Sequence, residues 1–245
     1  MKLATQDTGA PGTSVHEDGT ARSVKARGTR VASAAPGTTR QLLWGGVLAT
    51  PLFYLMVIIQ MLARPGFDIR RHPLSLLSLG DLGGIQIATF VLTGLAGVAC
   101  AVGMRRALRH GRGGTWAPLL VGLWGLGLIV AGIFLPDAAA GFPPGSGQGM
   151  TDQLSWHAIL HGVAFFTLFA ALVLACFVFA RRFVGLNRWN LVAYCAVTGV
   201  AAPAIVAFGM SNPSAAGVPF ALAGVVGFGW VSVVARVLMT DLCDQ

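Results

Sequence analysis

The sequence predicts an all-α fold, a polytopic membrane bundle of six transmembrane helices with both termini on the cytoplasmic side. Composition is the first observation: 55% of the 245 residues are hydrophobic, 11% are charged, and the mean hydropathy is +0.71. Soluble domains carry about 25% charged residues, so this chain belongs in a bilayer. The second observation is a series of long apolar stretches, and the third is a one-sided distribution of basic residues.

Six apolar stretches divide most of the chain. A helix rises 1.5 Å per residue, so about 20 residues cross the roughly 30 Å of hydrocarbon while satisfying their own backbone hydrogen bonds. The predicted spans are 42–62, 84–104, 117–135, 156–179, 190–209 and 218–238. They predict one transmembrane domain over residues 41–240, preceded by a disordered cytoplasmic tail at 1–40 that is rich in Gly, Ala, Thr, Ser and Pro.

The first three helices carry recognisable start and stop signals. Pro51 lies inside the first helix, where we expect it to produce a kink. The second helix starts after Gly83 and stops before Arg105 and Arg106. The third has Pro118 in its first turn, where a missing N–H costs little.

The last three helices follow the same logic. The fourth begins at Trp156, a residue type common at membrane interfaces, and stops before Arg181 and Arg182. The fifth contains Pro203, a second expected kink. The sixth contains "GVVGFG" (Gly224–Gly229), whose small residues favour close helix packing.

The basic residues predict the orientation of this bundle. Fourteen of the 17 Lys and Arg residues fall in segments on the side of both termini: Lys2, Arg22, Lys25, Arg27, Arg30, Arg40, Arg105, Arg106, Arg109, Arg112, Arg181, Arg182, Arg188 and Arg236. By the positive-inside rule that side is cytoplasmic. We therefore interpret the net charge of +8 as a topology signal with attraction to anionic membrane lipids, and not as a nucleic-acid-binding surface.

This orientation gathers polar residues at the outer face. In "QLSWHAILHG" (Gln153–Gly162), His157 and His161 lie one helical turn apart on one face, so both imidazoles can bind one metal ion. His72 is a candidate third ligand, and the set predicts a zinc site. Asp81 and Asp137 are candidate general bases, and Ser75 is a candidate donor to a developing oxyanion.

Simpler interpretations of the same residues stay open. The H-x₃-H pair has no built-in base, so the histidines also fit hydrogen-bonded structural residues, a proton relay or a substrate contact. Ser75 fits a helix cap or a solvated helix face. Asp137 fits a residue at a helix end that binds backbone, Arg70 or Arg71.

Four segments carry a family resemblance. They are "RPGFDIRRHPLSLLSLGDLGGIQIATFVLTGL" (Arg64–Leu95), "GLIVAGIFLPDAAAGFPPG" (Gly127–Gly145), "LSWHAILHGVAFF" (Leu154–Phe166) and "CFVFARRF" (Cys176–Phe183). From about Leu42 to Leu238 the chain resembles the bacterial domain of unknown function 998 family. That resemblance implies a six-helix protein of the plasma membrane, and it implies no activity.

Two functional hypotheses follow. The first is a non-enzymatic transport, lipid-interaction or assembly role, with a small molecule or lipid bound at the outer face. The alternative is a zinc-dependent membrane hydrolase that acts on a lipid or amide at the outer leaflet. The chain is also similar, in residue types alone, to alkaline ceramidase and progestin-receptor-like membrane hydrolases, which bind zinc through histidines.

Overall fold

The computed structural model describes residues 36–108, 113–149 and 153–243. All of these residues belong to one compact unit, Ala34–Gln245. The expected disordered tail at 1–40 falls almost entirely outside the described residues. Where the two overlap, the first helix has already begun at Pro36.

Six long helices and two short 3₁₀ helices make up the described unit, and none of its described segments is a β-strand. They are α1 (Pro36–Ala63), η1 (Leu74–Ser78), α2 (Gly83–Ala107), α3 (Trp116–Ile133), α4 (Trp156–Val184), α5 (Trp189–Ser211), η2 (Pro213–Ala215) and α6 (Gly217–Asp241). All six α-helices are long and apolar enough to cross a membrane. The prediction of an all-helical membrane bundle is thereby confirmed.

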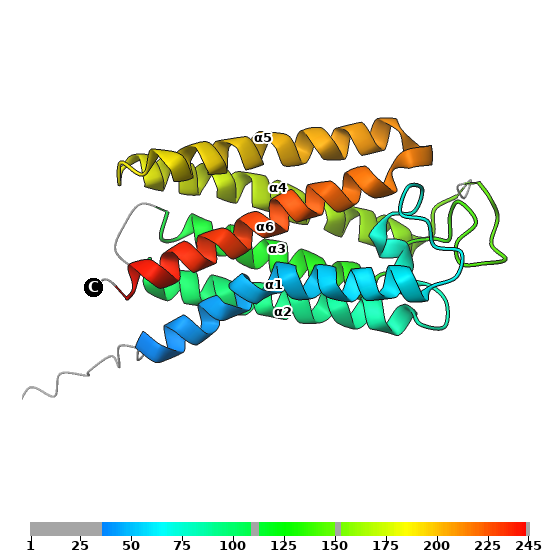
Figure 1. Cartoon of the computed structure of the whole chain (residues 1–245), viewed down its shortest axis with the longest axis horizontal. Coiled ribbons are helices and arrows are strands. Elements are labelled where there is room, and N and C mark those ends of the chain that lie inside the picture. The colour runs from blue at the N-terminus through cyan, green and yellow to red at the C-terminus, as the bar shows by residue number, and fades with distance from the viewer. Residues whose placement is uncertain (1–35, 109–112, 150–152, 244–245) are drawn as a thin grey trace, which may run out of the picture. The chain divides into compact units, whose positions relative to one another are not determined.

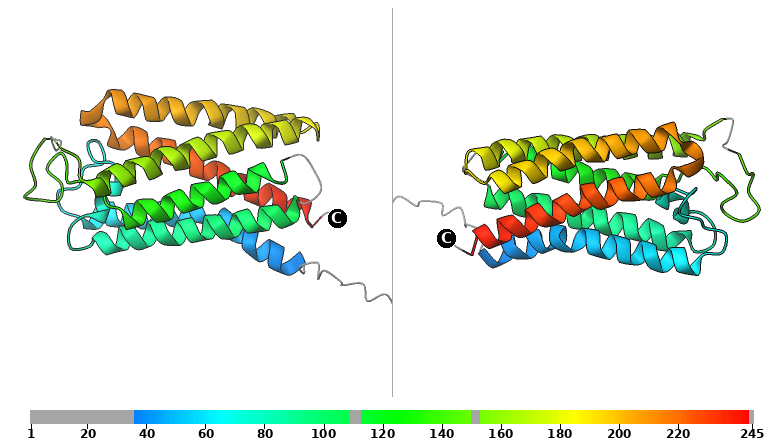
Figure 2. Two further views of the ribbon diagram at one scale, coloured as in Figure 1. Left: turned by 180° about the vertical axis from the view of Figure 1, so that it is seen from behind. Right: turned by 45° about the horizontal axis from the view of Figure 1, so that its top comes forward.

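The helices form a closed ring in chain order. Each long helix packs against the next, and α6 returns to pack against α1. Figure 1 and the two views of Figure 2 show this order, with α1 beside α2 and α4 beside α5. Because the chain runs the length of the bundle an even number of times, the start of α1 and the end of α6 lie at the same end of the bundle (Figure 1).

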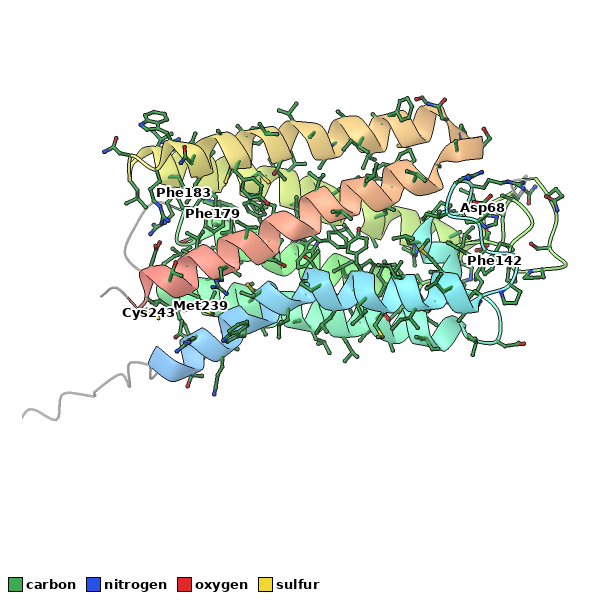
Figure 3. The ribbon with its side chains drawn as sticks, viewed as in Figure 1. Asp68, Phe142, Phe179, Phe183, Met239 and Cys243 are labelled. Atoms are coloured by element: carbon green, nitrogen blue, oxygen red, sulfur yellow. The ribbon has the colours of Figure 1, made fainter. Side chains whose placement is uncertain are left out.

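The two ends of the bundle differ in structure. One carries η1, η2 and the long loops, and we call it the η1 end (Figure 1). Figure 3 labels Asp68 and Phe142 at that end, and Phe183 and Cys243 at the opposite end.

Most helices extend beyond the predicted apolar cores. The helix α4 was expected to end at 179 and continues through Arg181 and Arg182 to Val184. Backbone hydrogen bonding does not stop at the edge of the hydrocarbon, and arginine side chains reach back to water from the last turn. Pro51 and Pro203 lie inside continuous helices, and α1 bends visibly along its length (Figure 1).

Glycines bring α2 and α3 into backbone contact. A Cβ atom on Gly94 would lie 2.5 Å from the carbonyl oxygen of Gly125, and a Cβ on Gly125 would lie 2.7 Å from the carbonyl oxygen of Gly94. Only glycine, whose side chain is a hydrogen atom, fits at both positions. Small residues thus allow α2 and α3 to pack closely.

Hydrogen bonds close the ring between the first and last helices. The hydroxyl of Tyr54 donates to the carbonyl of Ala221 at 2.8 Å. The hydroxyl of Ser232 lies 2.9 Å from both the carbonyl of Gly46 and the hydroxyl of Thr50. Such bonds between helices stabilise a membrane bundle by roughly 0.6 kcal/mol each on average.

Candidate functional site

The six residues singled out from the sequence all lie in the half of the bundle nearest the η1 end, but their side chains have different surroundings. His72 is buried, with 3% of its surface exposed, and packs between Phe67 and Phe142 with ring centroids 5.4 Å from each. Its Nδ1 accepts a hydrogen bond from the backbone N–H of Asp68 at 2.9 Å. Nε2 therefore carries the proton and donates to the carbonyl of Ala140 at 3.1 Å. Both ring nitrogens are used in holding two loops together.

His157 and His161 diverge although they share a helical face. His157 is exposed and stacks on Trp156, with ring centroids 3.6 Å apart. His161 is 8% exposed, and its Nδ1 lies 3.0 Å from the carbonyl oxygen of Ala131 and 2.8 Å from that of Phe134. Both side chains meet Phe134 at the end of α3, since the ring centroid of His157 lies 5.9 Å from that of Phe134, but only His161 is buried.

Asp137 joins the end of α3 to the start of α4. Its Oδ2 accepts a hydrogen bond from the backbone N–H of Ser155 at 2.8 Å, and the Ser155 hydroxyl caps α4 by accepting from the N–H of Ala158 at 3.1 Å. Hydrogen bonds from the hydroxyl and the amide of Ser155 lower the pKa of Asp137, and the nearby His157 lowers it further. These effects outweigh desolvation, which raises it. Asp137 is thus a carboxylate with a structural partner.

Arg64, the residue that follows α1, carries a buried charge. Its side chain is 9% exposed, lies 5.4 Å from the ring centroid of Phe142, and donates to the carbonyls of Leu77, at 3.1 Å, and Leu79. Burial lowers the pKa of Arg64, and the charge of the exposed Asp81 opposes that shift. The carboxylate of Asp81 therefore interacts electrostatically with Arg64 within the same loop.

These positions do not assemble as metal ligands. Among the described residues, no group of three or more His, Cys, Asp and Glu side chains lies close enough together to hold a metal ion. The nitrogens of His72 are engaged with the backbone, and His157 and His161 are in different environments. The zinc site at His72, His157 and His161 therefore stays a prediction, for which this arrangement of the described residues offers no ready-made ligand set.

A cavity inside the bundle brings together two of the six positions, His161 and Ser75. It has a volume of about 280 Å³ and lies in the half of the bundle nearest η1. All six long helices and η1 contribute to its wall. Eight aromatic side chains line it: Phe53, Tyr54, Phe90, Phe165, Phe166, Phe169, Phe220 and Phe228.

The floor of this cavity is a tightly packed aromatic cluster. Phe53 lies 5.5 Å from both Phe90 and Phe228, and Phe228 lies 5.2 Å from the fully buried Trp124. Edge-to-face pairs at these distances stabilise the core beyond their buried area. Phe53, Phe90 and Phe228 thus belong both to the cavity wall and to the packed core of the bundle.

The wall also includes surface residues. Phe166 of α4 and Met210 of α5 both line the cavity, and they are 50% and 51% exposed. Both belong to helices apolar enough to cross a membrane, so this part of the wall faces the lipid-contacting side of the bundle. The cavity therefore reaches the lateral surface near these two residues.

The polar groups on the cavity wall are few. Tyr54 uses its hydroxyl within the bundle, while the hydroxyl of Ser75 and the Nε2 of His161 have no hydrogen-bond partner among the described residues. The sequence offered no signal that Phe165, Phe166 and Phe169 line a cavity, since core phenylalanines follow the same pattern.

Comparison with known proteins gives a family without an activity. Residues 47–237 match a family described as "Protein of unknown function (DUF998)". No curated protein matches the chain, and no solved structure matches it. The resemblance seen in the sequence is confirmed over most of the chain.

Proposed function

We propose that this chain, which belongs to the DUF998 family of proteins of unknown function, is a non-enzymatic membrane protein that binds a lipid in its central cavity. The observation that carries the proposal is the aromatic-lined cavity of about 280 Å³ that reaches the side of the bundle. Apolar cavities of roughly 150 Å³ already accept a benzene-sized molecule. This one is large enough for a segment of hydrocarbon chain.

The chemistry of the wall supports an apolar occupant. Among the described residues that line the cavity, none is acidic and none is lysine or arginine. Ligand sites of this type bury most of an apolar ligand and use a small number of polar groups to orient it. His161 and Ser75 are the groups available for orientation.

The position of the cavity supports entry from the bilayer. Phe166 and Met210 are half exposed on faces that contact lipid when the helices span a membrane. A molecule that is already dissolved in the bilayer reaches them without crossing water. A lipid is therefore a better candidate than a water-soluble solute.

The charge distribution supports an orientation for this binding site. Most of the described arginines lie near the end opposite η1, and the positive-inside rule favours a cytoplasmic location for that end. Under this proposal both termini are cytoplasmic, the protein lies in the plasma membrane, and the cavity draws from the outer leaflet. Reporter fusions at Cys243 and within the 143–149 loop test the orientation, since only a cytoplasmic Cys243 and an external loop are consistent with it.

Photochemical labelling tests the binding itself. The protein is reconstituted in phosphatidylcholine nanodiscs with a long-chain alkyl probe that carries a mid-chain diazirine, and labelled peptides are mapped by mass spectrometry. We expect label on cavity residues of α4 and α5, around Phe166 and Met210. Saturable competition by unlabelled probe separates binding from passive contact with lipid.

Two glycines provide a matched pair of variants. A Cβ atom at either Gly162 or Gly229 meets no atom within 4 Å, so both positions accept a larger side chain. Gly162 lines the cavity and Gly229 does not. We expect Gly162→Leu to reduce cavity labelling and Gly229→Leu to leave it unchanged; equal labelling in all three proteins would contradict the proposal.

A further inference from the structure

The end of α3 fixes the proton on His161. The helix α3 ends at Ile133, so the carbonyls of its last turn lack the N–H partners that a continuing helix supplies. Nδ1 of His161 lies 3.0 Å from the carbonyl of Ala131 and 2.8 Å from that of Phe134. Both neighbours are acceptors, so Nδ1 must be the protonated nitrogen. In the neutral ring Nε2 then carries a lone pair and accepts a hydrogen bond.

This acceptor belongs to the cavity wall. His161 is 8% exposed and lines the cavity, and its ring packs edge-on against Phe90 with centroids 6.5 Å apart. Among the described residues Nε2 has no donor. Nε2 is not one of the fully enclosed unpartnered atoms in the described part of the chain, so it remains accessible, and a ligand that supplies an N–H or O–H gains a hydrogen bond there.

The surroundings of Nε2 narrow the choice of donor. An ammonium group is disfavoured because none of the described cavity residues is a carboxylate that could balance it. A carboxylate or phosphate is disfavoured because it offers an acceptor to an acceptor. An uncharged hydroxyl suits Nε2, since it donates a hydrogen bond and brings no charge into the cavity.

We infer that the cavity selects an uncharged lipid alcohol, a molecule with one free hydroxyl and a hydrocarbon chain, and that Nε2 of His161 accepts the hydrogen bond from that hydroxyl. The inference rests on the proposed function, because it assigns the ligand class of the same cavity. The hydroxyl lies at the polar side of the cavity, and the chain occupies the space among the phenylalanines.

A pair of probes isolates the hydroxyl. One is a long-chain alcohol with a mid-chain diazirine, and the other is its methyl ether with the same chain and the same photoreactive group. In nanodiscs the wild-type protein is expected to bind the alcohol about fivefold more tightly than the ether, the range of a single neutral hydrogen bond. Competition by the unlabelled compounds gives the ratio of the two dissociation constants.

Two histidine variants locate the acceptor. His161→Asn retains an N–H near the position of Nδ1 and removes Nε2, so we expect the ratio to fall to about one while the ether binds as in the wild-type protein. His157→Asn makes the same change at the exposed histidine one turn earlier, and it should keep the ratio. In wild-type protein with ¹⁵N-labelled histidine, the Nε2 resonance of His161 should also move upfield with the alcohol and not with the ether.

The outcomes distinguish the two levels of the argument. Equal affinity of the wild-type protein for alcohol and ether overturns the assignment of the ligand class while leaving cavity binding intact. A preference that persists in His161→Asn, or a stationary Nε2 resonance, overturns the role of His161. Absence of saturable labelling by either probe overturns the proposed function itself.

Discussion

Replacement of Arg64 tests how the η1 end is held together. Its buried guanidinium donates to the carbonyls of Leu77 and Leu79. Arg64→Met keeps much of the apolar stem and leaves both carbonyls without these donors. Hydrogen bonds from a charged group contribute about 1.5–3 kcal/mol each, and burying the guanidinium offsets part of that gain, so we expect a net loss of about 3 kcal/mol of unfolding free energy.

The assay is unfolding in mixed micelles of dodecylmaltoside with increasing mole fraction of dodecyl sulfate, followed by tryptophan fluorescence. Arg70→Met is the matched control, because Arg70 is an exposed arginine of the same loop. We expect that variant to remain within about 0.5 kcal/mol of the wild-type protein. A loss below 1 kcal/mol for Arg64→Met, or equal losses for the two variants, would refute the role assigned to the buried arginine.

Three further predictions follow from the loops and helix contacts. Because the pKa of Asp137 is lowered in the fold, its carboxylate stabilises the protein above its unfolded pKa near 4 and loses that effect as the pH falls through the folded pKa. Between about pH 5 and pH 3 the thermal midpoint of Asp137→Asn should therefore fall less than that of the wild-type protein. A variant whose pH profile equals that of the wild-type protein would contradict this. Gly125→Val forces a side chain against the backbone of α2 and should lower the unfolding free energy by about 1–3 kcal/mol in the micelle assay. Gly122→Val, where a Cβ lies 3.5 Å from its nearest neighbour, should lower it little. Similar losses for the two variants would count against the close packing of α2 and α3. The double variant His157→Ala/His161→Ala should retain the same zinc content as the wild-type protein by elemental analysis, and a stoichiometric zinc ion lost in the variant would restore the metal hypothesis.

Hydropathy was sufficient to predict all six helices, because apolar length is a requirement of the bilayer itself and not of any partner in the fold. The ends of the helices were harder to predict. At the end of α4, Arg181 and Arg182 were expected to stop the helix, yet they belong to it. Charged residues indicate where a helix leaves the hydrocarbon, while the helix itself ends where its backbone hydrogen bonds stop.

The candidate site was predicted less completely. The spacing predicted that His157 and His161 lie one turn apart on one helix, and in the structure both meet Phe134, the C-cap residue of α3. The imidazole of His161 is buried against the last turn of α3, while that of His157 is exposed beside Trp156. Whether each imidazole is buried depends on where the neighbouring helix α3 ends, and the spacing of residues along α4 does not predict that.

The cavity was not predictable from the sequence. Phe53, Phe90 and Phe228 belong to three different helices, and their meeting depends on how the ring closes. A phenylalanine that fills a core and one that borders an empty volume have the same periodicity. From the sequence, His161 was a candidate metal ligand and Ser75 a candidate oxyanion donor. The structure places both on the wall of this cavity.

Contact between α1 and α6 also governs when the binding site comes into existence during synthesis. Tyr54 bonds to Ala221, 167 residues further along the chain, and Phe53 meets Phe228. A ribosome that has released the first five helices has supplied neither Phe220 nor Phe228 to the wall. The site is thus assembled by the final insertion event, and a nascent chain paused before Gly217 should be unable to retain a lipid.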